Sequence, residues 1–211
     1  MIILFDLDGV LLDTESQYTS HWNMMGEKHF QDPNFGITIK GQTLVQILDR
    51  YVNNPELAEY LEEAVDKFEN EMEYDFIPGA LDFLKAVKEA RIPSAIVTSS
   101  ANKKMEQVYA RHPEIKELVD VILTAEHFTK SKPDPECFLK GMEVLGGTPE
   151  TTVIFEDSMH GIAAGRGSGA HLVGLATTNS REVLKQLCDL VIDDFNDITI
   201  EQLKQTFDIN N

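Results

Sequence analysis

Acidic residues that directly follow short apolar runs are the strongest chemical signal in this sequence. Asp6 and Asp8 come after one such run, and Glu156 and Asp157 come after another. In an extended segment, residues two apart point to the same side, about 6.6 Å apart along the chain. Four carboxylates gathered at one place would repel one another unless a cation or a proton held them. Oxygen ligands favour a hard cation such as Mg²⁺, which keeps several waters and binds substrate phosphates.

Hydroxyl and lysine side chains follow two further apolar runs. Thr98 and Ser99 come at the end of one run, where the next backbone N–H groups open a predicted helix and so suit an anion. Lys132 precedes Pro133, which stiffens the backbone there. A lysine held in this way can neutralise a phosphoryl oxygen, so these residues together indicate phosphate chemistry.

Several of these residues also have a purely structural interpretation. Asp157 and Ser158 are good types for a helix N-cap, and Ser100 could cap the helix that follows it. Lysines in loops are usually solvated, and Lys130 is a rival for the role of Lys132. Capping and metal binding can both hold, so the sequence leaves the alternatives open.

The candidate residues can meet only if the apolar runs are neighbouring strands of one sheet. Runs typical of strands buried on both faces occur at 2–5, 94–97, 119–123, 153–155 and 172–175. Helical patterns separate them at 80–90, 103–111, 136–145, 162–168 and 182–187. This alternation predicts an α/β fold with a Rossmann-like parallel sheet, and ligands bind such sheets at the carboxyl ends of the strands.

Residues 15–77 interrupt the alternation with helical periodicity and no buried strand. We therefore expect an α-helical cap subdomain at 15–77, inserted into an α/β core made of 1–14 and 78–211. The insertion is also more acidic, with 13 acidic and four basic residues in 63 positions. Within it, the segment 40–43 is either a substrate-specificity loop or an ordinary turn between helices.

Composition and charge exclude several classes of protein. The chain of 211 residues is 42% hydrophobic and 26% charged, as is typical of a globular domain, and is long enough to form a core without disulfides. Its 18 basic and 36 acidic residues give a net charge of −18. Such a surface repels phosphate backbones and anionic lipids, so we expect neither nucleic acid nor a membrane as partner.

The expected compartment is the cytoplasm. Cys137 and Cys188 are too few for a disulfide scaffold and suit a reducing environment. The first residues carry acids and no basic region, so a secretion signal is not expected. No apolar run reaches the roughly 18–20 residues of a membrane helix. We predict a monomer or a weak dimer.

Four ordered motifs resemble those of the haloacid dehalogenase superfamily. The segment Asp6–Thr14 resembles the first motif, Val97–Ser99 the second and Lys132–Pro133 the third. The segments 155–158 and 161–165 together resemble the fourth. The motifs occur in order and cover nearly the whole chain. A helical insertion between the first and second motifs is similar to the beta-phosphoglucomutase-like phosphatase branch.

The resemblance implies roles for the residues that bind and transfer phosphate. Asp6 would attack phosphorus and form an aspartyl phosphate. Asp8 would protonate the leaving oxygen and then activate the hydrolytic water. Thr98, Ser99 and Lys132 would hold the transferring phosphoryl oxygens, with Lys132 part of the catalytic set.

The resemblance also implies a Mg²⁺ cofactor. Its ligands would be Asp6, the backbone carbonyl of Asp8 and Asp157, with Glu156 binding directly or through water. The ion would shield the anionic nucleophile from the anionic substrate.

Departures from the family pattern narrow the expected activity. Haloacid dehalogenases lack the second aspartate, so the presence of Asp8 disfavours dehalogenation. Beta-phosphoglucomutases carry a cap histidine and a cap arginine, whereas this chain has Tyr18 and Leu44 there and His21 three residues late. We therefore expect a Mg²⁺-dependent phosphomonoesterase for a small phosphorylated metabolite such as a sugar phosphate. The alternatives are a phosphosugar mutase and a noncatalytic protein that binds a metal or a partner.

Overall fold

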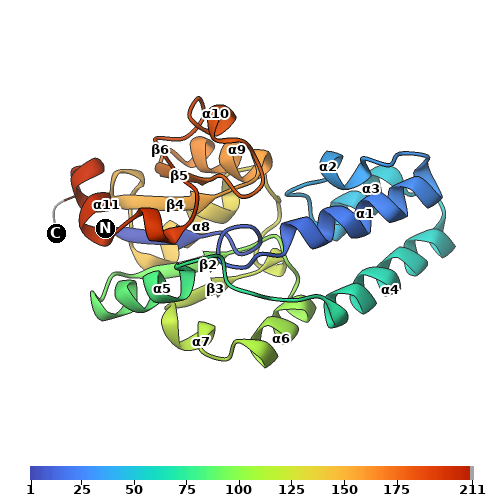
Figure 1. The fold of residues 1–211 in the computed structure, drawn as a ribbon, viewed down its shortest axis with the longest axis horizontal. Coiled ribbons are helices and arrows are strands. Elements are labelled where there is room, and N and C mark those ends of the chain that lie inside the picture. The colour runs from blue at the N-terminus through green and yellow to red at the C-terminus, as the bar shows by residue number, and fades with distance from the viewer. Residues whose placement is uncertain (210–211) are drawn as a thin grey trace.

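A six-stranded parallel sheet between two layers of helices forms the centre of the molecule (Figure 1). A computed structural model of the chain describes residues 1–209. The strand order is β3-β2-β1-β4-β5-β6, and every neighbouring pair is parallel. The strands are β1 (Ile2–Phe5), β2 (Ser94–Val97), β3 (Val121–Leu123), β4 (Thr152–Glu156), β5 (His171–Leu175) and β6 (Leu190–Ile192). The predicted Rossmann-like α/β fold is confirmed.

Five helices lie between β1 and β2. They are α1 (Glu15–Phe30), α2 (Phe35–Thr38), α3 (Leu44–Tyr51), α4 (Pro55–Glu71) and α5 (Ala80–Glu89). The remaining helices are α6 (Asn102–Arg111), α7 (Ile115–Leu118), α8 (Glu136–Leu145), α9 (Met159–Ser168), α10 (Arg181–Leu184) and α11 (Ile200–Thr206). Short 3₁₀ turns occur at η1 (Ala125–His127), η2 (Pro149–Thr151) and η3 (Phe195–Asp197).

The alternation of side chains along β1 feeds two hydrophobic cores, one on each face of the sheet. Ile3 and Phe5 point into the core shared with α5, α6 and α11. Ile2 and Leu4 point into the core shared with α8 and α9. Since both faces of β1 are fully covered, the strand is rigid, and its carboxyl end is a fixed platform for the residues that follow.

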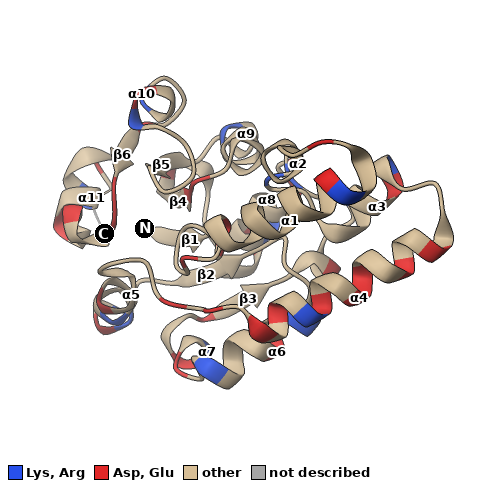
Figure 2. Cartoon of the chain, turned by 45° about the vertical axis from the view of Figure 1, so that its right-hand side comes forward, with Lys and Arg blue, Asp and Glu red and all other residues tan. Residues whose placement is uncertain are grey.

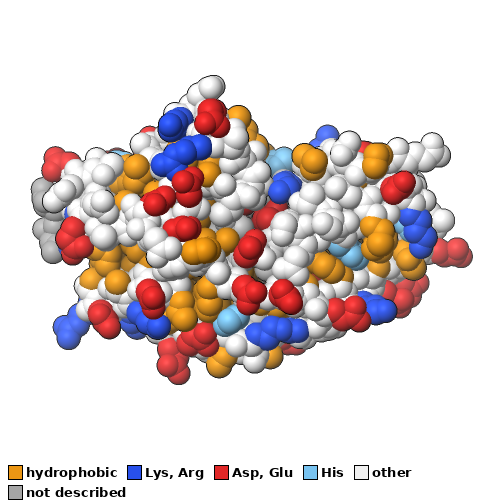
Figure 3. All heavy atoms as spheres, in the orientation of Figure 1, with side chains coloured by type: hydrophobic (Ala, Val, Ile, Leu, Met, Phe, Trp, Pro, Cys, Tyr) orange, Lys and Arg blue, Asp and Glu red, His pale blue; other side chains and the backbone are white. Residues whose placement is uncertain are grey.

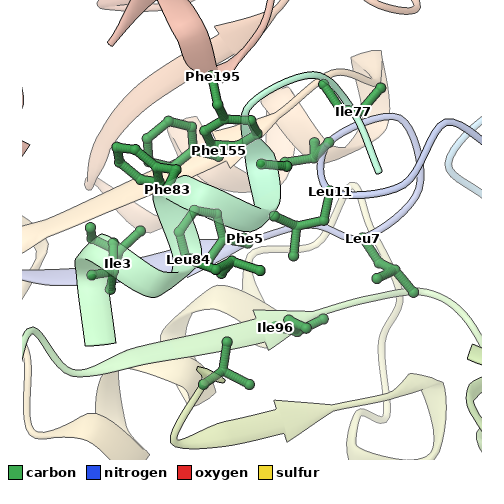
Figure 4. Packing of buried hydrophobic residues seen from close by; sticks show 14 of the residues in the cluster. Ile3, Phe5, Leu7, Leu11, Ile77, Phe83, Leu84, Ile96, Phe155 and Phe195 are labelled. Atoms are coloured by element: carbon green, nitrogen blue, oxygen red, sulfur yellow. The ribbon is translucent and has the colours of Figure 1, made fainter. Parts of the chain in front are cut away.

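Four phenylalanine rings pack together beside the central strands (Figure 4). The ring centroids of Phe5 and Phe155 lie 5.1 Å apart in a stacked arrangement. Phe195 stacks on Phe155 at 5.3 Å and contacts Phe83 of α5 at 5.1 Å. This cluster ties β1 and β4, whose ends carry the acidic pairs, to the C-terminal part of the chain.

The sequence prediction differs from the structure at the edges of the sheet. The third strand was expected at 119–123, but its pairing with β2 begins at Val121, since α7 continues to Leu118. The sixth strand, β6, was not predicted, because a run of three apolar residues is too short to indicate a strand. The helix expected at 182–187 is only Arg181–Leu184.

Helices α1 to α4 pack around a hydrophobic cluster of their own. Its buried members are Trp22, Met25, Phe35, Ile39, Ile47, Leu48, Leu61 and Val65. Local signals start the helices: Thr43 and Gln46 form a capping box on α3, and the Asn54 side chain caps α4 just before Pro55. The expected helical character of this segment is therefore observed.

The surface of these helices is acidic, as the sequence indicated. Acidic side chains recur along α4 (Figure 2). The space-filling view shows acidic side chains along the part of the surface where α4 lies (Figure 3). Among the described residues, no helix is both long and apolar enough to cross a bilayer.

Truncation of the aromatic cluster should cost much of the stability of the fold. We expect Phe195→Ala to lower the free energy of unfolding by about 3–5 kcal/mol, because it removes a buried ring that three others contact. Urea unfolding followed by circular dichroism measures this loss. Val183→Ala, at a side chain that is 42% exposed, is the matched control and should change the value by about 0.5 kcal/mol or less. Equal effects of the two substitutions would contradict this account of the core.

Candidate active site

A cavity of about 570 Å³ opens at the carboxyl ends of the strands. Six of the seven predicted site residues line it, and the seventh, Glu156, lies fully buried behind Lys132. The lining predicted residues are Asp6, Asp8, Thr98, Ser99, Lys132 and Asp157. They come from the ends of β1, β2 and β4 and from the loop before α8. The sheet topology thus brings together residues up to 151 positions apart, from Asp6 to Asp157.

Lys132 is the centre of a buried ion-pair network. Its Nζ donates to Asp6 Oδ1 at 2.6 Å and to Glu156 Oε1 at 2.6 Å. Burial lowers the pKa of Lys132, but the two carboxylates raise it by more than burial lowers it. The net shift is therefore upward, and the ammonium stays charged. Lys130 is exposed and pairs with Asp134 at 3.3 Å. The structure therefore favours Lys132 over its rival.

Glu156 uses both carboxylate oxygens within the protein. While Oε1 accepts from Lys132, Oε2 accepts from the backbone amides of Asp157 and Ser158, each at 2.9 Å. The first turn of α9 passes so close that a Cβ on Gly161 would lie 1.7 Å from Glu156 Oε1. Glycine is therefore required at this position, and Glu156 fixes both Lys132 and the start of α9.

The expected helix cap at the end of β4 is present beside the acidic pair. The Ser158 side chain accepts from the amide of Gly161 at 3.0 Å and begins α9. Capping by Ser158 leaves the carboxylate of Asp157 free for another role. The two interpretations of this segment are thus compatible.

Three buried carboxylates form a group that fits a metal ion. Oxygens of Asp6, Glu156 and Asp157 lie within 4.8 Å of one another. Asp157 is 1% exposed, and neither of its carboxylate oxygens makes a hydrogen bond of normal geometry to the described residues. Burial raises its pKa well above the usual range, and the neighbouring carboxylates add to this effect, although the nearby Thr178 hydroxyl opposes the rise. An unpartnered buried carboxylate beside two others suits a hard divalent cation such as Mg²⁺.

Asp6 combines burial with a single ammonium partner. Burial raises its pKa to about 8, although Lys132 opposes the shift. The turn that follows keeps the space near Asp157 open, because Gly9 has a φ of +74° and its Cβ would lie 2.2 Å from Asp157 Oδ2. A second cation near Asp6 would hold this carboxylate in its ionised form at neutral pH.

Asp8 faces a different set of partners. Its carboxylate accepts from the hydroxyls of Thr14 and Ser100, the latter at 2.8 Å, and forms an ion pair with Lys104. Burial alone would raise the pKa of Asp8, but Lys104 and the hydroxyl donors more than offset it, so the pKa is lowered. The pKa values of the two aspartates of the first motif are therefore shifted in opposite directions, so a nucleophilic role for Asp6 depends on the neighbouring cations that hold it ionised.

Lys104 is a functional candidate that sequence reasoning missed. It lies in the first turn of α6 and is 2% exposed, with its Nζ 4.5 Å from the ring centroid of Tyr18. The spacing in the sequence could have indicated its burial, because Lys104 and the buried Val108 lie four residues apart on one helix face. A lysine in the apolar stripe of a helix indicates a buried charge with a partner.

The hydroxyl residues after β2 surround the start of α6. Thr98 is 1% exposed, and its Oγ1 accepts from the amide of Ser100 at 3.0 Å. The predicted cap at Ser100 is wrong: the N-cap of α6 is Ala101, without a side-chain hydrogen bond. Ser100 instead donates its hydroxyl to Asp8, which is the stronger acceptor because it is charged.

Helices α1 to α4 supply the wall of the cavity that faces the strand ends. All four residues of the segment 40–43 line it, and the carbonyl of Lys40 contacts His160 Nδ1 of α9 at 2.7 Å. Tyr18 and Leu44 also line the cavity, at the two positions where the mutase pattern has a histidine and an arginine. His21 is not among the lining residues and stacks on Phe68 at 4.4 Å.

The sequence belongs to the family whose motifs it resembles. The haloacid dehalogenase-like hydrolase family profile matches residues 3–175, so the chain is a member of that family. Hexitol phosphatase A from Escherichia coli (strain K12) is 30% identical over 205 residues, which cover 93% of this chain and 92% of the relative. Validoxylamine A 7′-phosphate phosphatase from Streptomyces hygroscopicus subsp. limoneus is 27% identical over 210 residues, covering 93% and 95%.

A solved structure of similar fold is that of a phosphosugar mutase. Beta-phosphoglucomutase from Clostridium difficile matches with a TM-score of 0.82 and 27% identity, over 99% of this chain and 98% of that one. The predictions of the family and of an enzyme are therefore confirmed. The relatives include both phosphatases and a mutase, which leaves the reaction of this chain to be argued from its site.

The buried charge of Asp157 predicts a measurable gain of stability on its removal. Its pKa is higher in the folded protein than the ordinary 3.8, so its contribution to stability decreases as the pH rises above about 4. We expect Asp157→Asn to raise the metal-free Tm at pH 8 by at least about 3 °C, since 1 kcal/mol corresponds to about 2–4 °C in a chain of this size. The same substitution should abolish the rise in Tm that Mg²⁺ gives the unaltered protein.

Asp13→Asn is the matched control, because Asp13 lies close in the chain but its side chain is exposed. It should leave both the metal-free Tm and the response to Mg²⁺ unchanged. Differential scanning calorimetry with and without MgCl₂ measures both quantities. A metal-free Asp157→Asn protein that melts below the unaltered one would contradict the account of this carboxylate.

Proposed function

We propose that this enzyme is a Mg²⁺-dependent phosphomonoesterase that acts on a small phosphorylated metabolite through an aspartyl phosphate. One observation carries the proposal: Asp6 lies at the cavity with Lys132 at 2.6 Å and belongs to the acidic group with Asp157. A carboxylate placed between an ammonium and a metal site can approach an anionic phosphate without prohibitive repulsion. The named phosphatases among the relatives support the same reaction class.

The proposed metal ligands are the carboxylates of Asp6 and Asp157 and the backbone carbonyl of Asp8. Glu156 acts through its neighbours, because Lys132 and backbone amides already occupy its oxygens. A bound Mg²⁺ supplies charge neutralisation for the phosphoryl group and its nucleophile.

Asp6 acts as the nucleophile in the proposed reaction. Its carboxylate oxygen forms a bond to phosphorus while the bond from phosphorus to the leaving oxygen breaks. Asp8 gives a proton to that oxygen and then takes one from water, which attacks phosphorus and releases Asp6. Lys132, Thr98 and Ser99 hold the phosphoryl oxygens, which the amides at the start of α6 and the buried ammonium favour.

We further propose that 15–77 functions as a cap over a core made of 1–14 and 78–211. The separate hydrophobic cluster of α1 to α4 and the cavity between these helices and the strand ends support this division. The segment 40–43 then belongs to the specificity-determining wall. The cytoplasmic location and the monomeric or weakly dimeric state stay predictions.

Plain hydrolysis is favoured over the mutase alternative by the cap wall of the cavity. A mutase must hold a second phosphate of its bisphosphate intermediate, and Leu44 offers an apolar side chain where a cation is needed. The noncatalytic alternative is disfavoured because pure binding requires no second aspartate such as Asp8. The two phosphatase relatives are named for a hexitol phosphate and for a 7′-phosphate, which favours a phosphorylated polyol or sugar as the substrate.

A panel of phosphomonoesters with Mg²⁺ tests the proposed function. The panel contains hexose and hexitol phosphates, glycerol phosphate, phosphoglycolate, nucleotides and an aryl phosphate. We expect metal-dependent release of phosphate that Asp6→Asn and Asp8→Ala each reduce by at least about 10³-fold, because both act in the chemical steps. Asp13→Asn should retain activity. Undiminished turnover by Asp6→Asn, or a requirement for a bisphosphate primer, would contradict the proposal.

The ion pair of Lys104 with Asp8 predicts a shift in the pH profile. In Lys104→Met the buried carboxylate loses its ammonium, so the pKa of Asp8 rises and Asp8 becomes protonated at a higher pH. We expect the acidic limb of kcat to move to higher pH by about one unit or more. Lys104→Arg keeps the charge and should shift the limb less. An unchanged profile in Lys104→Met would mean that this lysine serves packing alone.

A further inference from the structure

We infer that the cavity selects phosphomonoesters whose alcohol portion carries no second negative charge, and that Asp66 of α4 helps to set this preference. The inference rests on the proposed function and specifies its substrate class. Its basis is the charge balance of the cavity wall, in which every lysine already has a carboxylate partner.

Four lysines line the cavity, and each forms an ion pair. Lys132 pairs with Asp6 and Glu156, and Lys104 pairs with Asp8, all at the strand ends. The other two lysines are also neutralised. Lys40 lies 3.5 Å from Glu15, and Lys103 pairs with Asp66 across the junction of α6 and α4.

The carboxylates exceed these cations. Eight acidic and four basic residues line the cavity, so its formal charge, with every carboxyl group counted as ionised, remains negative even after a divalent cation is added. Lining carboxylates beyond those already named as lysine partners include Glu62 and Glu69 of α4 and Glu126. No arginine or histidine is among the described residues that line it. One phosphate can be held at the strand ends by Lys132 and a metal, but a second anion would face carboxylates in a partly desolvated space.

The rest of the wall suits a neutral alcohol. Trp22, Ile39 and Leu44 present apolar surface to the cavity. The Tyr18 hydroxyl already donates to Glu69 at 2.8 Å, so it is not a free donor for an anion. Carboxylates such as Glu62 accept hydrogen bonds from hydroxyl groups, as a polyol offers them. The occupant that matches both features is a neutral, hydroxyl-bearing leaving group.

Matched substrate pairs test the selection. We would measure kcat/KM with Mg²⁺ for glycerol 1-phosphate against 3-phosphoglycerate, and for a hexose 6-phosphate against the 1,6-bisphosphate of the same sugar. In each pair the second compound adds one anionic group. We expect kcat/KM to be at least about tenfold higher for the neutral member, meaning the compound whose alcohol portion is uncharged. The second anionic group of the other compound has no free cation to compensate it in a negative cavity.

Two variants change the charge of the wall. Asp66→Asn removes a carboxylate and frees Lys103, and Leu44→Arg adds a cation to the apolar surface. Each should reduce the preference for the neutral member by about threefold or more, mainly by increasing kcat/KM for the charged one. Glu63→Gln is the matched control, because Glu63 lies on α4 but does not line the cavity. It should leave the ratio unchanged, and a thermal melt confirms that each variant folds.

The outcomes separate this inference from the proposed function. If the unaltered enzyme hydrolyses the charged member as fast as the neutral one or faster, the inference is overturned while the phosphatase remains. If Asp66→Asn and Glu63→Gln shift the ratio equally, the role of Asp66 is overturned. Failure to hydrolyse any phosphomonoester would overturn the proposed function and this inference with it.

Discussion

The burial of one lysine between two carboxylates is the constraint on which the site depends. Lys132 contacts Asp6 from β1 and Glu156 from β4, so it joins the ends of two adjacent central strands through charge. Removing Lys132 would leave two buried carboxylates without their shared cation, which is far more costly than the ion pairs themselves are stabilising. The same contacts that hold the strand ends in place thus orient the carboxylate that we propose as the nucleophile.

Most of the fold and the main site residues could be predicted from sequence, because both depend on local patterns. Strands buried on two faces produce continuous apolar runs, and parallel pairing forces the residues after those runs to one edge of the sheet. Asp6, Lys132 and Asp157 were found in this way and lie together in the structure. Strand β6 was missed because three residues carry too little pattern.

The rest of the site depends on three-dimensional contacts that no local pattern reports. Lys104 and Ser100 contact Asp8 because α6 begins shortly after the end of β2, next to the end of β1. Asp8 lies more than 90 residues away from both of them in the chain. Ser100 was interpreted as a cap, since capping is the commonest use of a serine before a helix. The pairing of Lys103 with Asp66 likewise required the placement of α4 against α6. Charge compensation across the cavity is therefore a property of packing rather than of motifs.

The stereochemical course at phosphorus tests the central claim most directly. A phosphorothioate substrate made chiral at phosphorus by sulfur and one heavy oxygen isotope is hydrolysed in water that carries the other heavy isotope, and the configuration of the chiral thiophosphate product is determined by NMR. Each in-line displacement inverts the configuration, so attack by Asp6 followed by attack of water predicts overall retention. Inversion would mean that water attacks the substrate directly, and it would contradict the assignment of Asp6 as the nucleophile.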